Sequence, residues 1–283
     1  MSFIIASLPN LTKRMLTSAT EAVEIPAFVG LKNPVEINFL TGEKSPALAV
    51  QMLRSDDANK STALFNLICA LGNRSTIVFC NQREIVEQVS NFLKDKGIVN
   101  VFYHGAMEQQ ERDAALCKFR NGSSNVLVTT DLAARGLDIP NIRYIVHFQL
   151  PTSQESFIHR NGRTARMEAS GTAILLLAPQ ETVPGYIDPE PIEIELNADA
   201  GLPAKPDWST FYISVGKKDK VNKIDIVGFL TNKGRLKKEE IGLIEVKDFF
   251  SFVAIRKSKA GPTLQLIKEE RIKNKKVKIE VAK

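Results

Sequence analysis

The chain has 283 residues, of which 43% are hydrophobic and 25% are charged. This composition is typical of a soluble globular protein, and the length leaves room for about two domains. No apolar run approaches the roughly 18 to 20 residues that a membrane span needs, and the first ten residues lack the basic region of a signal peptide. Cys69, Cys80 and Cys117 have no CxxC spacing, so we expect reduced, buried thiols in a cytoplasmic protein.

Charge is unevenly distributed along the chain. Residues 208–283 carry 19 Lys and Arg against 9 Asp and Glu, a net charge of +10, whereas residues 1–207 have a net charge of −4. A basic segment of this size predicts a partner with many negative charges, with nucleic acid as the first candidate and an anionic membrane surface as the second.

The first 60 residues do not predict a domain of their own. The stretches "RMLTSAT" (14–20) and "PVEINFL" (34–40) are each consistent with a strand, but neither has a neighbouring helix to pack against.

From residue 75 to residue 179, buried strands alternate with amphipathic helices. The expected strands lie at 76–80, 98–103, 125–130, 142–148 and 171–179, and the expected helices at 83–97, 108–122 and 153–163. This alternation predicts an α/β domain with a parallel sheet and helices on both of its faces. Ligands of such sheets bind in the loops beyond the carboxyl ends of the strands.

Two segments of different character follow. Residues 180–207 contain five prolines and seven acidic residues, and we expect an acidic, proline-rich linker. Residues 208–283 show the order strand, helix, strand, strand, helix, strand, which predicts a small α+β domain of the RNA-recognition-motif type. The stretch "DFFSFVAI" matches the aromatic strand of such domains at Phe250, Phe252 and Val253 and departs from it at three other positions.

Two stretches that follow expected strands carry the residues of a candidate site. "TTDLAARGLDIP" (129–140) combines hydroxyl groups, a glycine and the start of a helix, which suits phosphate groups, and Asp138 is placed to accept a hydrogen bond from a sugar hydroxyl. In "HRNGRTAR" (159–166), Arg163 and Arg166 stand three residues apart, so on a helix they would converge on a single anion. A surface cluster of salt bridges is the alternative for these arginines.

Four motifs, in chain order, resemble those of the DEAD-box RNA helicases. "VFCNQRE" resembles motif IV, "HGAMEQQER" contains a QxxR element, "TDLAARGLD" resembles motif V, and "HRNGRTAR" resembles motif VI. The resemblance implies that residues 62–179 form the second RecA-like domain of such a helicase.

The same resemblance implies roles for individual residues. Arg163, Arg166 and His159 would be catalytic, the two arginines as arginine fingers on the γ-phosphate of ATP. Asp138 would contact the ribose, and His159 would help to couple the two RecA-like domains. Four residues would lie along the RNA backbone: Thr130, Gly136, Gln109 and Arg112. For the last two, a solvated helix face is the alternative.

The N-terminal stretch resembles the end of a first RecA-like domain, because Ser18, Ala19 and Thr20 match the "SAT" of motif III, which implies a part in interdomain coupling. We therefore expect a residual first domain over 1–40 and an interdomain linker over 41–61. The 283 residues contain neither a GxxxxGK(S/T) loop nor a DEAD tetrad. ATP and Mg²⁺, the cofactors of a complete family member, are thus not expected to bind tightly to this chain alone, and we expect no metal site and no catalysis by it alone.

Residues 208–283 resemble the RNA-binding domain of the DbpA subgroup of these helicases, most specifically at "VGKKDKV" and "VAIRK". The resemblance implies binding to a hairpin of large-subunit ribosomal RNA during ribosome assembly. On charge alone, six cations near turns and a strand end are expected to contact RNA: Lys217, Lys218, Lys220, Arg235, Arg256 and Lys257. The alternative is that these side chains are solvated and add only to solubility.

Taken as a whole, the sequence predicts the C-terminal portion of a DbpA-like DEAD-box ATP-dependent RNA helicase that binds structured ribosomal RNA. Two alternatives stay open. One is a non-catalytic RNA-binding protein derived from a helicase, and the other is a piece that works with a first RecA-like domain supplied in trans.

Overall fold

The computed structural model describes residues 2–8, 10–17, 25–37, 48–134, 139, 142–164, 171–196 and 200–282. The chain divides into two compact units, Met1–Ser45 and Pro46–Lys283.

The first unit has little regular structure in its described residues. It contains the helix α1 (Ser2–Ala6) and the short 3-10 helix η1 (Ala27–Val29). Arg14 Nη1 donates a hydrogen bond of 2.6 Å to the carbonyl oxygen of Gly30. The described parts of the two expected strands, 14–17 and 34–37, form no strand, and the remaining residues of both lie outside the described residues.

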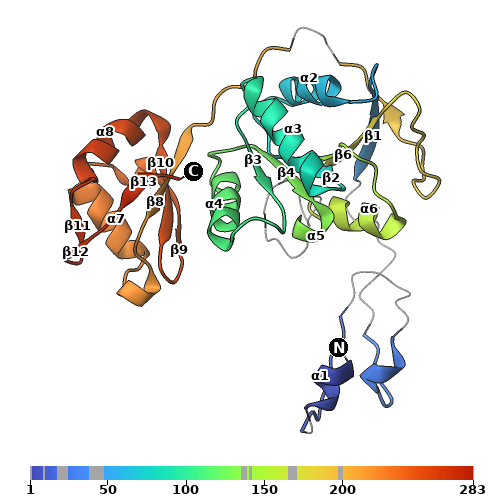
Figure 1. The fold of residues 1–283 in the computed structure, drawn as a ribbon, viewed down its shortest axis with the longest axis horizontal. Coiled ribbons are helices and arrows are strands. Elements are labelled where there is room, and N and C mark those ends of the chain that lie inside the picture. Colours follow the sequence, from blue (N-terminus) through green and yellow to red (C-terminus); the bar gives the residue numbers. More distant parts are fainter. Residues whose placement is uncertain are drawn as a thin grey trace. The chain divides into compact units, whose positions relative to one another are not determined.

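A seven-stranded parallel sheet forms the centre of the second unit (Figure 1). Its strand order is β3-β4-β2-β5-β6-β1-β7. The strands are β1 (Ala49–Arg54), β2 (Thr76–Cys80), β3 (Asn100–Tyr103), β4 (Val126–Thr130), β5 (Tyr144–His147), β6 (Thr172–Leu177) and β7 (Ile192–Glu193). The predicted parallel α/β fold is therefore confirmed.

Helices cover both faces of this sheet because its central strands are apolar on both sides. The helices are α2 (Ser61–Leu71), α3 (Arg83–Asp95), α4 (Gln109–Arg120), α5 (Asp131–Ala134) and α6 (Gln154–Asn161). Val78 and Val146 face the core formed with α2 and α3. Ile77 and Ile145, one position earlier on the same strands, face α4 and α5. Phe157 of α6 stacks on His147 on that second face.

Two strands form inside segments that we expected to be linkers. Ala49–Arg54, within 41–61, pairs with β6 over six residues, and Ile192–Glu193, within 180–207, pairs with β1. Neither strand can be recognised from its own sequence, because each pairs with a strand more than a hundred residues away. The pairing of β7 is also only two residues long. The domain boundaries themselves stay a prediction.

The C-terminal domain is a second, antiparallel sheet with two helices. Its strand order is β13-β8-β10-β9, and a separate hairpin joins β11 to β12. Its elements are β8 (Trp208–Ile213), η2 (Lys217–Asp219), α7 (Lys223–Asn232), η3 (Lys238–Glu240), β9 (Ile241–Val246), β10 (Ser251–Arg256), α8 (Lys257–Ile267), β11 (Arg271–Ile272), β12 (Lys275–Lys276) and β13 (Ile279–Val281). The predicted small α+β domain is confirmed. Within the described part of the chain, no helix is both long and apolar enough to cross a membrane.

Candidate functional site

The order of the parallel strands places a crevice at the carboxyl ends of β4, β2 and β5. The chain leaves β2, builds β3 and β4 on one side, and then crosses to form β5 on the other side of β2. Such a reversal of direction is where open α/β sheets bind their ligands. Asn81 and Asp131 directly follow β2 and β4, and Gln149 lies two residues after the end of β5, so these residues border this crevice.

A buried arginine joins these three strand ends. Arg160 is 1% exposed, and its Nε and Nη2 donate hydrogen bonds of 2.5 and 2.8 Å to the two carboxylate oxygens of Asp131. Its Nη2 also donates to Asn81 Oδ1, and its Nη1 donates to the carbonyl oxygen of Gln149, each at 2.7 Å. The guanidinium lies over the ring of Phe79, 5.2 Å from its centroid. Arg160 is therefore a positioning residue, since its donors are already engaged within the domain.

His147 supports the same arrangement as a neutral side chain. Burial, and secondly the positive charge of Arg160, lowers the pKa of His147 to about 3. His147 Nε2 lies 3.1 Å from Asn161 Oδ1 on the last turn of α6. A neutral imidazole packs beside the buried guanidinium without adding a second positive charge.

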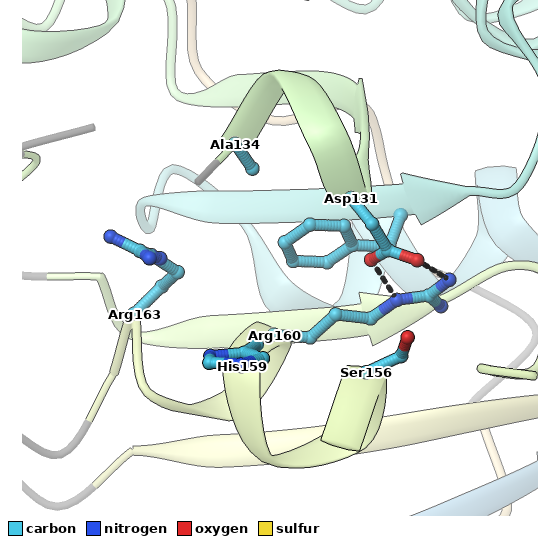
Figure 2. Close-up of a pocket in the computed structure, with 7 residues that line it drawn as sticks. Asp131, Ala134, Ser156, His159, Arg160 and Arg163 are labelled. Atoms are coloured by element: carbon cyan, nitrogen blue, oxygen red, sulfur yellow. Dashed lines mark hydrogen bonds and ion pairs between the residues drawn. The ribbon is translucent and has the colours of Figure 1, made fainter. Parts of the chain in front are cut away.

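The residues next to this pair line a small cavity of about 10 Å³, roughly the room of one water molecule. Its lining consists of Phe79, Asp131, Ala134, Ser156, His159, Arg160 and Arg163. Figure 2 shows Arg163 pointing away from the Asp131–Arg160 pair, while His159 lies on α6 beside Arg160. His159 Nε2 lies 3.3 Å from Glu155 Oε1.

The structure corrects one premise about Arg163. Helix α6 ends at Asn161, with Gly162 at its C-cap, and the backbone N–H of Arg163 bonds to the carbonyl oxygen of Arg160 in a tight turn. Arg163 therefore lies beyond the end of α6, and the premise that the helix continues through Arg163 is wrong. Glycine has a low helix propensity, which favours the end of the helix at Gly162. Arg166 itself lies outside the described residues.

The residues expected along the RNA backbone fall at one edge of the sheet. Thr130 is the last residue of β4. Gln109 begins α4 and is exposed, while Arg112 in the same turn is partly buried. Arg112 Nε is buried and has no hydrogen-bond partner among the residues that the structure describes. Other predicted residues lie outside the described part of the chain: Gly136, Asp138, Ser18, Ala19 and Thr20.

The six cations expected to bind RNA do not form one group. Lys217 and Lys218 lie in η2 beyond the end of β8, and Lys220 caps it. Arg256 pairs in register with Trp208, at the other end of β8. The six-residue strand makes these ends about 17 Å apart. Lys257 follows Arg256, and Arg235 lies in a turn after α7 with a φ of 54°.

Sequence reasoning did not select Arg160, Asp131 or Asn81 as site residues. All three residues stand within the quoted motifs, but those motifs were interpreted through the arginines that would bind phosphate, Arg163 and Arg166. The available signal was physical, because a guanidinium in an apolar helix face needs a carboxylate nearby. Choosing Asp131 as that carboxylate requires the sheet topology, which brings residues 29 positions apart into contact.

Comparisons with known proteins agree with this architecture. The helicase conserved C-terminal domain family matches residues 59–168, and the DbpA RNA-binding domain family matches residues 210–281. ATP-dependent RNA helicase DbpA of Escherichia coli is 32% identical over 99% of this chain and 63% of its own length. Its namesake from Bacillus subtilis is 29% identical over 99% of this chain and 65% of its own length. The chain thus spans slightly less than two thirds of either relative.

A solved structure is similar as well. The crystal structure of the E. coli DEAD-box protein SrmB, bound to regulator of ribonuclease activity A, is 34% identical, with a TM-score of 0.49. The match covers 56% of this chain and 98% of that one.

Fold, site and family matches together define a RecA-like helicase C-terminal domain followed by an RNA-binding domain. The chain therefore joins a helicase conserved C-terminal domain to a DbpA RNA-binding domain, and over nearly its whole length it is similar to the DbpA RNA helicases.

Proposed function

We propose that the chain forms the RNA-binding, C-terminal portion of a DbpA-type ATP-dependent RNA helicase that acts on large-subunit ribosomal RNA in the cytoplasm. The observation that carries the proposal is the anchoring of Arg160 by Asp131. This buried pair fixes the end of α6 at the crevice of the sheet, so that His159 and Arg163 line the same hollow.

Arg163 is the residue that we assign to ATP. Phosphoryl transfer needs positive charge where the transferring group becomes more negative, and an arginine finger contributes about 10³ to 10⁵ in rate. The guanidinium of Arg163 borders this hollow and carries a permanent positive charge that suits a phosphate group, whereas Arg160 is occupied internally. In the described residues no three His, Cys, Asp or Glu side chains gather as metal ligands. A first RecA-like domain, in the same or another chain, would supply the remaining contacts to ATP and Mg²⁺.

RNA would bind at two places. Thr130, Gln109 and Arg112 would contact the backbone at the edge of the helicase domain, as would Gly136. The cations of the C-terminal domain would hold a structured hairpin. Each lysine that neutralises a phosphate releases a counterion, so the affinity should fall with salt.

Binding of a large-subunit ribosomal RNA hairpin to the whole chain tests the RNA part. We expect log Kd to rise linearly with log salt concentration, with a slope of about 0.9 for each duplex phosphate contacted. An unrelated stem-loop of equal length should bind more weakly at every salt concentration. Equal affinity for both RNAs, or affinity independent of salt, would overturn the proposal.

A further inference from the structure

The antiparallel sheet of the C-terminal domain has two different faces. Alternate residues of a strand point to opposite faces, so Phe211 and Val253 pack against α7 and α8, whereas Tyr212 and Phe252 lie on the other side. In RNA-recognition motifs, aromatic residues on the sheet stack on RNA bases. Here the face away from the helices carries Tyr212, Phe250 and Phe252, with ring centroids 5.4 to 5.9 Å apart.

Helix α4 of the helicase domain covers this aromatic face. Phe252 is 1% exposed and forms one apolar cluster with Ala114 and Cys117 of α4 and with Ala282. Leu116, on another side of α4, packs against the parallel sheet. Different sides of the helix therefore pack against the two sheets, and Phe252 is not accessible to an RNA base.

Two ion pairs flank the apolar cluster. Lys247 Nζ lies 3.1 Å from Asp113 Oδ1, and Arg120 Nη1 lies 3.2 Å from Glu245 Oε1. All four side chains are at least two-thirds buried. The helix contributes one acid and one base, and the C-terminal domain contributes the opposite charge to each. Such a crossed arrangement fixes orientation, because a reversed helix would bring like charges together.

The same contacts position the basic turn of the C-terminal domain. The backbone N–H groups of Lys217 and Lys218 donate to the carbonyl oxygens of Lys247 and Asp248, each at 2.8 Å. The ammonium of Lys247 also pairs with Asp113 of α4, which directly follows Arg112 in the sequence. A short path of hydrogen bonds and one ion pair thus connects the basic turn to the first turn of α4.

We propose that the aromatic face of the C-terminal sheet is a docking surface for α4 and not a platform for RNA bases, and that docking aligns Lys217 and Lys218 with Gln109 and Arg112 along one RNA path. The claim that α4 docks on the aromatic face follows from the contacts described above. The claim of a shared RNA path rests on the proposed function.

Cys117 reports directly on docking in the whole chain. It is fully buried in the cluster, and burial raises the pKa of its thiol to about 12, so its reaction with N-ethylmaleimide should be slow. Cys69 and Cys80 belong to the helicase core and serve as internal references. Labelling of each cysteine is followed by mass spectrometry of its peptide.

Charge reversal then tests the interface. Lys247→Glu should speed labelling of Cys117 about tenfold, the factor that corresponds to 1.4 kcal/mol, without changing Cys69 or Cys80. Adding Asp113→Lys should restore protection. The exchange Arg120→Glu with Glu245→Lys provides a second swap, which is coupled to the first because Lys247 Nζ also lies 3.3 Å from Glu245 Oε2. Lys238→Glu, an exposed change of equal charge on η3, should have no effect. Rapid labelling of Cys117 in the unaltered chain, or no response to either reversal, would overturn the docking.

RNA supplies the last arm of the experiment. Saturation with a ribosomal RNA hairpin that carries a single-stranded extension should leave Cys117 protected, and the extended RNA should bind more tightly than the hairpin alone. Lys247→Glu should remove that advantage. Exposure of Cys117 by RNA would show that bases compete with α4 for the aromatic face and would contradict the proposal. If the hairpin fails to bind at all, the proposed function fails while the labelling result for docking stands.

Discussion

The guanidinium of Arg160 and the carboxylate of Asp131 meet in a two-point pair, with hydrogen bonds of 2.5 and 2.8 Å, at the carboxyl edge of the parallel sheet. The pair connects α6 to the end of β4, and so it joins the two motifs that face the crevice. Its burial makes it a structural requirement of the site rather than a contact to a ligand.

Removing Arg160 should destabilise the helicase domain. Arg160→Ala leaves the Asp131 carboxylate without its partner in a poorly solvated place, which costs about 3 kcal/mol or more of the free energy of unfolding. Urea unfolding followed by circular dichroism measures the change. Arg54→Ala breaks a half-exposed pair with Glu193, 3.5 Å away, and should cost less than about 1 kcal/mol. Equal effects of the two variants would contradict the account.

His147 predicts a particular pH dependence of stability. Its folded-state pKa of about 3 lies below the usual 6.5 of an unfolded chain. The unfolded state therefore binds more protons between these values, and stability is present above pH 6.5 and is lost as the pH falls. From pH 7 to pH 5 this loss is about 2 kcal/mol. His147→Gln should flatten the unfolding free energy over that range, and an unchanged slope would refute the prediction.

Gly216 should be required for the basic turn. A Cβ there would lie 2.3 Å from the carbonyl oxygen of Lys247, which accepts a hydrogen bond from Lys217. Gly216→Ala should destabilise the C-terminal domain by about 1 to 3 kcal/mol and weaken RNA binding. Gly228, in α7, has open space around it, so Gly228→Ala should stabilise by about 0.5 to 1 kcal/mol. Thermal unfolding measures the change in stability that each variant causes. Changes of the same sign in both variants would count against this interpretation of the turn.

Lys217 and Lys218 should act on RNA through phosphate. Each is exposed in η2, so replacement by alanine should lower affinity for different sequences alike and reduce the salt slope by about 1. Filter binding at several salt concentrations provides the measurement. A change in sequence preference with an unaltered slope would instead indicate contacts to bases.

Local pattern predicted most of the fold. Strands such as Thr76–Cys80 are continuous apolar runs, and Arg83–Asp95 repeats apolar residues at helical spacing, so both elements followed from their own sequence. The edge strands β1 and β7 did not, because they become strands only by pairing with distant partners. The packing of α4 against the second sheet could not be predicted from the sequence either, since Ala114 and Cys117 are small residues without a strong apolar signal.

The candidate site divides in the same way. His159 and Arg163 were selected because the motifs are contiguous in sequence, and the structure places both at the lining of the hollow; their roles stay a prediction. Arg160 and Asp131 were missed, since their role depends on burial and on the order of strands. The premise that Arg163 continues a helix failed because Gly162 ends it.

The most direct test of the central claim is RNA-stimulated ATP hydrolysis by a fusion protein that joins this chain to the part of E. coli DbpA that it does not cover. The account predicts turnover that falls about 10³-fold or more with Arg163→Ala, while hairpin affinity and the free energy of unfolding stay unchanged. Turnover that persists at the full rate in Arg163→Ala would contradict it.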